Sequence, residues 1–277
     1  MPRDGVICEV TNQPTSDNAC LDCALRWGLQ EDWQTGVMRH CRFNYPMIHA
    51  LLAPDEERKG AGISATMLTG CPRQSIWKMR RAYAIYPGQM WAALDGTWVH
   101  AALEAHNEPN ILAEVRLVKK MNNGVVLTVF TGKMDRYIPA LRRLEDYKTK
   151  DGGKLFTVAP PDYVAQLNIY AYMLTTGCAI QGTGEIVQFP VDELVLFPLS
   201  HKAPGNPVKC PVWPLDKTEA FITERIAVYL AAEQDPDFLP PRRYRDPHRE
   251  TFCRDYCPFV DRCAQAGGAL ESDYFAH

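Results

Sequence analysis

The middle of the sequence contains two short motifs, GKMD (132–135) and DYKT (146–149), whose residue types could bind a metal ion and a phosphate. Residues two apart on a β-strand point to the same face, so we expect Asp146 and Lys148 to project together. Asp135, on the neighbouring strand of a hairpin, can reach the same point. Carboxylates are ligands for Mg²⁺ or Mn²⁺, and such an ion lowers the pKa of a water molecule. Lys148 could orient or deprotonate that water, or stabilise charge on the phosphate.

Three further side chains could join this group. His100, in GTWVH (96–100), lies on an expected helix, and a neutral imidazole there would suit Mn²⁺ better than Mg²⁺. Gln166 and Tyr170 are four residues apart on another expected helix, so they face the same side. They could contact a DNA backbone or fix Lys148. Taken singly, such residues are usually a solvated strand face or satisfied core residues, so the information lies in their order along the chain.

The hydrophobic pattern predicts the elements that would position these residues. An Asn-Gly pair between two apolar, β-branched runs predicts a hairpin. Asp216 and Glu219 resemble a capping box that opens a helix. Strands are expected at 112–119, at 125–130 with a strand leading to Asp135, at Leu144–Thr149 and at 192–198. Helices are expected from Pro72, over 89–106, over 162–175 and from Asp216 to about residue 232. Residues 235–250 are expected to form an irregular arm.

In this order, GTWVH, GKMD, DYKT and QLNIY (166–170) resemble the RecB-like branch of the PD-(D/E)xK nuclease superfamily, over about residues 65–265. The resemblance implies an α/β fold with a restriction-endonuclease-like core, in which helices flank a central mixed β-sheet. It implies metal-dependent hydrolysis of DNA, as an exonuclease acting on single strands or ends in recombination, repair or phage DNA processing. Glu114 lies near an earlier acidic residue of many members, but that match is loose. The resemblance implies the metal ligands His100, Asp135 and Asp146, the catalytic Lys148, and the supporting Gln166 and Tyr170.

A cluster of cysteines near the C-terminus predicts a second kind of metal site. Cys253, Cys257 and Cys263 are closely spaced, and three thiolates need a fourth ligand to complete a tetrahedral set. Their spacing, with the remote Cys71, resembles AddB nuclease domains and CRISPR-associated RecB-like exonucleases. That resemblance implies a structural [4Fe–4S] cluster that closes the fold. Zinc held by the same four thiolates remains the alternative.

The N-terminal segment carries a further four cysteines. Cys20 and Cys23 form a CxxC half-site, which Cys8 and Cys41 could complete as a zinc site, with His40 as an alternative to Cys41. The alternative is a turn with surface thiols. We therefore expect two domains: a small Cys-rich module at residues 1–54 and the nuclease domain at 55–277, after a linker at Asp55–Gly62.

Charge and composition limit the possible partners. The chain has 277 residues, 46% of them hydrophobic, and its net charge is −3, which predicts a globular protein without a wholesale nucleic-acid-coating surface. Local basic groups could still contact DNA phosphates without sequence preference. These are Lys78, Arg80, Arg81, Arg242, Arg243 and Arg245.

The ends and the cysteines predict a location. The N-terminus lacks a secretory signal and no run is long enough to span a membrane, so we expect the cytoplasm of a bacterium, or of a host cell for a phage-encoded protein. Cys178 and Cys210 stand apart and are expected to be small buried hydrophobic residues. Two other functions remain open: a DNA-binding accessory with little activity that works with a recombinase, helicase or integrase, and a redox sensor.

Overall fold

The structure, a computed structural model, describes residues 5–25, 29–43, 45–52, 62–105, 108–122, 127–149, 155–200 and 203–270. The chain divides into two compact units. Unit 1 combines Met1–Lys59, Gln74–Asp95 and Tyr244–Gly268, and unit 2 combines Gly60–Arg73, Gly96–Arg243 and Ala269–His277. The N-terminal residues thus share a unit with the C-terminal cysteines, a division that differs from the expected boundary at 54 and 55. Most of the expected linker, residues 55–61, lies outside the described residues.

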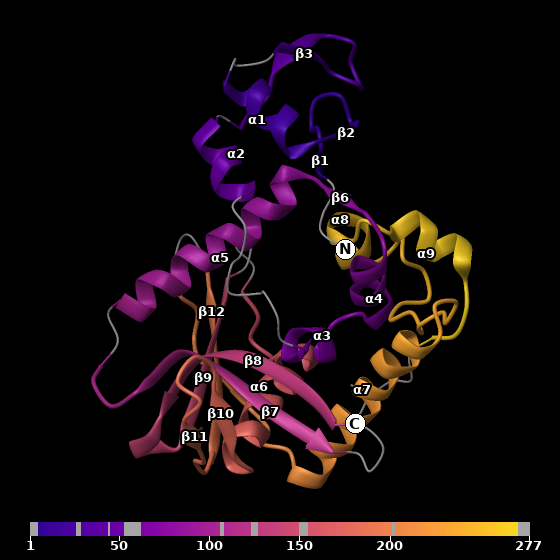
Figure 1. Cartoon of the computed structure of the whole chain (residues 1–277). Helices are drawn as coiled ribbons and strands as arrows, with labels where there is room; N and C mark the ends of the chain where they lie inside the picture. Colours follow the sequence, from indigo (N-terminus) through magenta and orange to yellow (C-terminus); the bar gives the residue numbers. More distant parts are fainter. Residues whose placement is uncertain are drawn as a thin grey trace. The chain divides into compact units, whose positions relative to one another are not determined.

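An eight-stranded sheet is the centre of unit 2, which therefore has a mixed α/β fold (Figure 1). Seven strands lie in the order β11-β10-β7-β8-β9-β12-β13, and the eighth, β5, pairs with β8. Neighbours are antiparallel except for two parallel pairs, β9 with β12 and β5 with β8. The strands are β5 (Ile63–Ser64), β7 (Leu112–Asn122), β8 (Leu127–Ile138), β9 (Arg143–Thr149), β10 (Cys178–Ile180), β11 (Ile186–Val187), β12 (Glu193–Leu199) and β13 (Val208–Cys210).

The expected hairpin is present as β7 and β8. Their register runs from Leu112 opposite Tyr137 to Asn122 opposite Leu127, while the expected turn residues 123 and 124 lie outside the described part of the chain. The strand expected to lead to Asp135 is β8, which runs without interruption from Leu127 to Ile138. Gly132 does not interrupt the strand, and its pairing with Leu117 keeps the ladder intact.

Helices of unit 2 pack on this sheet. α6 (Pro161–Thr175) contacts β7, β9 and β12, and α7 (Leu215–Gln234) packs against α6. The expected capping box is wrong: Pro214 is the N-cap of α7, which starts one residue before Asp216 and has no side-chain cap. α3 (Ala65–Thr69) begins at Ser64, whose hydroxyl accepts a hydrogen bond from the Met67 N–H. Among the helices of the described residues, none is long and apolar enough to cross a membrane.

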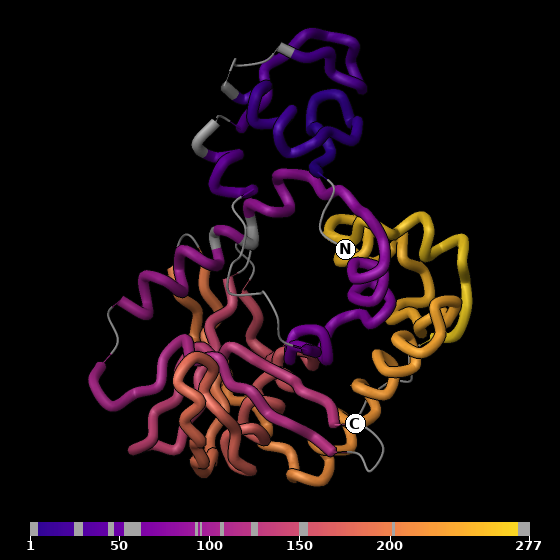
Figure 2. Tube along the Cα trace, viewed as in Figure 1, coloured from indigo at the N-terminus to yellow at the C-terminus, as the bar shows by residue number. Residues whose placement is uncertain are grey.

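Unit 1 consists of short elements drawn from three stretches of the chain. Figure 2 colours these stretches indigo, purple and yellow along the sequence. Strand β1 pairs with β2 and with β6, and β3 pairs with β4 as a hairpin. The elements are β1 (Gly5–Ile7), β2 (Pro14–Thr15), α1 (Asp17–Leu25), β3 (Leu29–Glu31), β4 (Met38–His40), α2 (Tyr45–Leu52), β6 (Ala84–Ile85), α8 (Thr251–Tyr256) and α9 (Val260–Ala266), with most of α4 (Pro72–Arg80) and the first half of α5 (Pro87–Ala105).

Two small hydrophobic clusters stabilise unit 1. The first joins α1 and α2 through Ala24, Phe43, Ile48 and Leu51. The second joins α4 to the C-terminal stretch, where Trp77 packs edge-on against Phe259 at 5.6 Å between ring centroids. Unit 2 buries many more hydrophobic residues than these two clusters contain. Because hydrophobic stabilisation scales with the apolar area that is buried, we expect unit 2 to be the more stable unit.

Candidate metal centre

The GKMD motif lies where one edge of β8 changes partner. Along this edge β5 pairs with Phe130 and Thr131, and β9 pairs with β8 only from Arg136 onward. Residues 132–135 of β8 lie between these two segments and pair with neither β5 nor β9. Asp135 compensates: its Oδ2 accepts a hydrogen bond of 2.6 Å from the Tyr147 N–H of β9. The Asp135 carboxylate thus bridges an opening in the ladder between β8 and β9, and it is itself buried.

Three potential ligands meet at this opening. His100 comes from α5, Glu114 from β7 and Asp135 from β8, and within the described residues these three bring one ligand atom each to within 4.8 Å of the others. His100 Nδ1 lies 2.8 Å from Glu114 Oε1 and 3.6 Å from Asp135 Oδ1. One imidazole and two carboxylates are a ligand set that suits Mn²⁺ or Mg²⁺.

The register of the hairpin brings Glu114 into this group. Ala113 pairs with Arg136 and Val115 with Met134, so Glu114 lies opposite Asp135 on the neighbouring strand. Its φ of 54° is left-handed, which is uncommon for a residue other than glycine and marks local strain. The sequence offered only a loose match at Glu114, because the register that places it opposite Asp135 was not predicted.

The charges in the group influence one another strongly. Burial and the carboxylate of Asp146 raise the pKa of Asp135 to about 7. The hydrogen bond with Glu114 raises the pKa of His100. Burial alone would raise the pKa of Glu114, but hydrogen bonds from His100 and Lys133 outweigh it and lower that pKa. Buried carboxylates that repel one another are stabilised by a bound cation.

Asp146 and Lys148 project together from β9, as their spacing predicts. Lys148 Nζ lies 2.7 Å from Asp146 Oδ2 and 3.0 Å from Oδ1. Burial would lower the pKa of Lys148, but Asp146 and Asp135 outweigh burial and raise it. Although Oδ2 is close to the ammonium, it is buried without a hydrogen bond of good geometry. Asp146 acts electrostatically on Asp135 yet stands outside the group of His100, Glu114 and Asp135.

Gln166 and Tyr170 support the lysine from α6. Gln166 Nε2 donates to Tyr170 Oη at 2.8 Å, and Tyr170 is 2% exposed. The Tyr170 phenol acts electrostatically on Lys148. The ring packs directly on β8 at Gly132, where an added Cβ would lie 2.3 Å from Tyr170 Cε1. The glycine of the GKMD motif is therefore explained by the space that Tyr170 requires.

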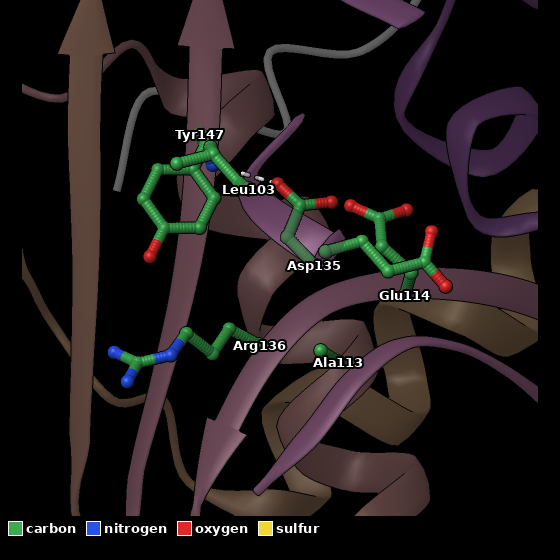
Figure 3. Close-up of a pocket in the computed structure, with 7 residues that line it drawn as sticks. Leu103, Ala113, Glu114, Asp135, Arg136 and Tyr147 are labelled. Carbon is green, nitrogen blue, oxygen red and sulfur yellow. Dashed lines mark hydrogen bonds between the residues drawn. The ribbon is translucent and has the colours of Figure 1, made fainter. Parts of the chain in front are cut away.

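A pocket opens beside the group. Figure 3 shows Asp135 and Glu114 on one side, and Arg136 directed away from them. Arg136 instead pairs with Glu145 at 2.6 Å, on the opposite face of β9 from Asp146. Glu104, one helical turn after His100 on α5, also lines the pocket. The pocket is lined by Leu103, Glu104, Ala113, Glu114, Asp135, Arg136 and Tyr147.

The expected cluster cysteines belong to both units. Cys253 and Cys263 are buried in unit 1, where Cys263 and the half-buried Cys257 contact the Trp77–Phe259 cluster. Cys71 is buried in unit 2, after α3, next to Gly70, whose carbonyl accepts a hydrogen bond from Arg225. The four-cysteine cluster would therefore need ligands from both units, and it stays a prediction.

The six expected DNA contacts are also divided between the units. Lys78, Arg80, Arg81 and Arg245 belong to unit 1, and Arg242 and Arg243 to unit 2. Arg243 donates to the Thr69 carbonyl at 2.9 Å, so it helps to hold the end of α3. Lys78 Nζ lies 5.6 Å from the centroid of the Tyr83 ring. Arg81 and Arg245 are exposed.

Comparison with known proteins does not place the chain in a family. No protein-family model matches the sequence, and no curated protein matches it significantly. One similar solved structure is the crystal structure of SSO0001, at 19% sequence identity and a TM-score of 0.47. The similarity covers 78% of this chain and 91% of that chain. A similarity at this level says nothing about activity, ligands or partners.

Proposed function

We propose that this protein is a divalent-metal-dependent deoxyribonuclease with a restriction-endonuclease-like core, acting as an exonuclease on single-stranded DNA or DNA ends. The observation that carries the proposal is the pairing of two features in one opening of the sheet. One is the group of His100, Glu114 and Asp135, and the other is the Asp146–Lys148 pair. Cation ligands beside a buried lysine suit hydrolysis of a phosphodiester better than transport or storage of a metal.

The residues fit a divalent cation. Asp135 is 8% exposed, and burial and Asp146 raise its pKa to about 7, so a cation would relieve a repulsion within the site. The buried Asp146 Oδ2, without a well-formed hydrogen bond, supplies a further oxygen at the same opening. His100, Glu114 and Asp135 would hold the cation, with Asp146 as the adjacent carboxylate. When bound, the cation would supply Lewis acidity to a phosphate oxygen and acidify a water molecule.

Each remaining side chain has a role in positioning. Asp146 holds the Lys148 ammonium at the opening, where its positive charge would stabilise the negative charge that develops on a phosphate. Tyr170, oriented by Gln166, excludes water from one side of the lysine. Asp135 keeps β9 in place through the Tyr147 N–H, so the same carboxylate would bind the cation and fix the strand that carries Lys148.

The iron–sulfur cluster belongs to the same proposal. Cys253, Cys257 and Cys263 offer three thiols in one region, and Cys71 lies near the buried guanidinium of Arg225, which it influences electrostatically. Four cysteine thiolates are the ligand set of a [4Fe–4S] cluster. Anaerobically purified protein should be brown and contain iron and acid-labile sulfide. A colourless protein with stoichiometric zinc at these cysteines would contradict this part while leaving the nuclease proposal intact.

The decisive experiment follows the digestion of DNA labelled at its 5′ or 3′ end, with Mn²⁺, Mg²⁺ or EDTA. Linear single strands should be degraded in the presence of either metal ion, and closed single-stranded circles should survive. Lys148→Met and Asp146→Asn should each reduce the rate by about 10²–10⁴-fold. Lys209→Met is the matched control, because that exposed lysine pairs with Glu193 away from the opening.

Three results would overturn the proposal. They are the absence of metal-dependent cleavage of any DNA by folded protein, cleavage that persists at full rate in the Lys148 variant, and equal loss in the Lys209 control. DNA binding without cleavage would favour the accessory function. Cleavage of closed circles would keep the nuclease and exclude a strict exonuclease.

A further inference from the structure

Four thiols outside the candidate metal centre come together in unit 1. Cys8 follows directly after β1, Cys20 and Cys23 lie on α1, and Cys41 follows directly after β4. All four are half-buried. Three separate elements thus contribute sulfur ligands within one small part of the chain, and the proposed nuclease mechanism uses none of them.

Backbone structure fixes two of these positions. Cys8 lies in a tight turn between β1 and β2, where its N–H donates to the Gln13 carbonyl at 2.9 Å and its carbonyl accepts from the Asn12 N–H at 2.8 Å. Asn12 has a left-handed φ of 56°, which closes the turn. α1 packs against β1, and Cys20 and Cys23, three residues apart, share one face of that helix.

The β3–β4 hairpin brings the fourth thiol to the same helix. Gln30 of β3 contacts Cys23 Sγ through its Nε2 at 3.7 Å. The register pairs Leu29 with His40, so Cys41 follows β4 at the end of the hairpin where β3 begins, near Gln30. Cys20 and Cys41 both pack against the Ala24, Phe43, Ile48 and Leu51 cluster. Cys41 is half-buried in this region and His40 is exposed, which favours the cysteine as the ligand.

The electrostatics confirm that the four thiols are near neighbours. Burial, followed by Cys41, Cys23 and Cys8, raises the pKa of Cys20 to about 12. Burial, with contributions from Cys8 and Cys23, also raises the pKa of Cys41. The four thiols therefore lie close enough to influence one another.

We propose that Cys8, Cys20, Cys23 and Cys41 bind one zinc ion in a closed, structural site. Four thiolates make a tetrahedral set that zinc prefers, and no position is left open for a substrate. In the described structure the one group of three ligands within 4.8 Å is that of His100, Glu114 and Asp135, so the four sulfurs must close further around the ion. This proposal is independent of the proposed nuclease function.

The test uses the full-length protein, with zinc and iron measured by mass spectrometry in the same sample. The wild-type protein should contain one zinc ion per chain. Cys20→Ser and Cys23→Ser should each lose most of it and keep their iron. Cys178→Ser is the matched control, because this buried cysteine lies on β10 of unit 2, and it should retain the zinc.

A second measurement guards against variants that fail to fold. Metal-free wild-type protein is titrated with Co²⁺ under reducing conditions, and four thiolates should give strong thiolate-to-cobalt charge-transfer bands together with tetrahedral d–d bands. Cys41→His should still bind Co²⁺ with shifted bands, because imidazole is also a ligand, whereas His40→Ala should not change the spectrum.

Several outcomes would overturn the proposal. Wild-type protein that contains no zinc and gives no tetrahedral cobalt spectrum would do so. Full zinc in Cys20→Ser and Cys23→Ser would place the metal elsewhere. Loss of the cobalt spectrum in His40→Ala but not in Cys41→Ser would replace Cys41 by His40 as the fourth ligand. Iron lost together with zinc in both variants would contradict separate sites.

Discussion

The two groups of potential ligands differ in how the protein holds them. His100, Glu114 and Asp135 project from a helix and two long strands of an eight-stranded sheet, and they already lie close together. The four N-terminal cysteines lie on or beside short elements with a small apolar cluster, and their sulfurs stand further apart. The sheet therefore pre-organises its site, whereas the cysteine region needs the ion to complete its fold.

Removal of zinc should separate the two regions most clearly. Structural zinc in small domains contributes on the order of 10–16 kcal/mol to folding, so a strong chelator should unfold the segment that contains α1 and the β3–β4 hairpin. Hydrogen exchange should show lost protection in α1 and unchanged protection in β8 and α6. Chelator plus excess Zn²⁺ is the control. Equal loss in α6 would mean that both regions depend on the ion.

Asp135→Asn should abolish cleavage and yet stabilise the metal-free protein. We expect a rate loss of about 10³-fold, because a cation ligand is removed. Burial and Asp146 raise the pKa of Asp135 from 3.8 to about 7, so ionisation of this carboxyl destabilises the metal-free wild-type protein progressively as the pH rises between those values. Asparagine removes that penalty, and it can still accept the hydrogen bond from Tyr147.

The measurement is thermal unfolding in EDTA at about pH 4 and about pH 8. The variant should have the higher melting temperature at the higher pH, with little difference at the lower. Asp192→Asn is the control, since this exposed carboxylate pairs only loosely with Arg142 at 3.2 Å. A variant that is less stable than the wild-type protein at both pH values would contradict a pre-organised, repulsive site.

Glu114→Gln tests whether the carboxylate opposite Asp135 serves metal binding. Loss of one carboxylate from the group should weaken Mn²⁺ binding by about 10–100-fold, with the sheet intact. Isothermal titration gives the affinity. Glu108→Gln, which removes an exposed partner of Arg136, should leave the affinity unchanged. If both variants bind Mn²⁺ like the wild-type protein, Glu114 has only a structural role with His100 and Lys133.

Gly132→Ala should have the smallest effect. The added Cβ would lie 2.3 Å from Tyr170 Cε1 and 3.1 Å from Ala65 Cβ, so the ring that packs beside the site must shift. We expect destabilisation of about 1–3 kcal/mol, as for other overpacked sites, with slower cleavage. A double-mutant cycle with Tyr170→Ala measures the coupling. Additive effects of the two changes on stability would show that the contact with Tyr170 is unimportant.

The sequence predicted the regular parts of unit 2 well. Period-two patterns located β9 and β12, and helical patterns located α5, α6 and α7, because each element buries one face in a large core. The failures occurred where local rules compete. Asp216 has the composition of a cap, but the helix starts earlier, after Pro214.

The site was predicted in part for the same reason. Asp146 and Lys148 follow strand alternation, and Gln166 and Tyr170 follow helical spacing, so their contacts could be expected. The contribution of Glu114 depends on the register of the β7–β8 hairpin, and the role of Arg243 in holding α3 depends on a contact between residues distant in sequence. Neither a hairpin register nor a distant contact leaves a periodic signal in the sequence.

The order of the chain in unit 1 has a consequence for synthesis on the ribosome. Unit 1 needs Tyr244–Gly268, which is made only after the whole stretch Gly96–Arg243 of unit 2. At about 5–20 residues per second, that delay is about 7–30 seconds. The sheet can therefore begin to fold before Phe259 is available to Trp77. The cluster of Ala24, Phe43, Ile48 and Leu51 can form early, whereas Trp77 must wait with its apolar surface exposed, which makes α4 a part of the nascent chain that a chaperone would protect.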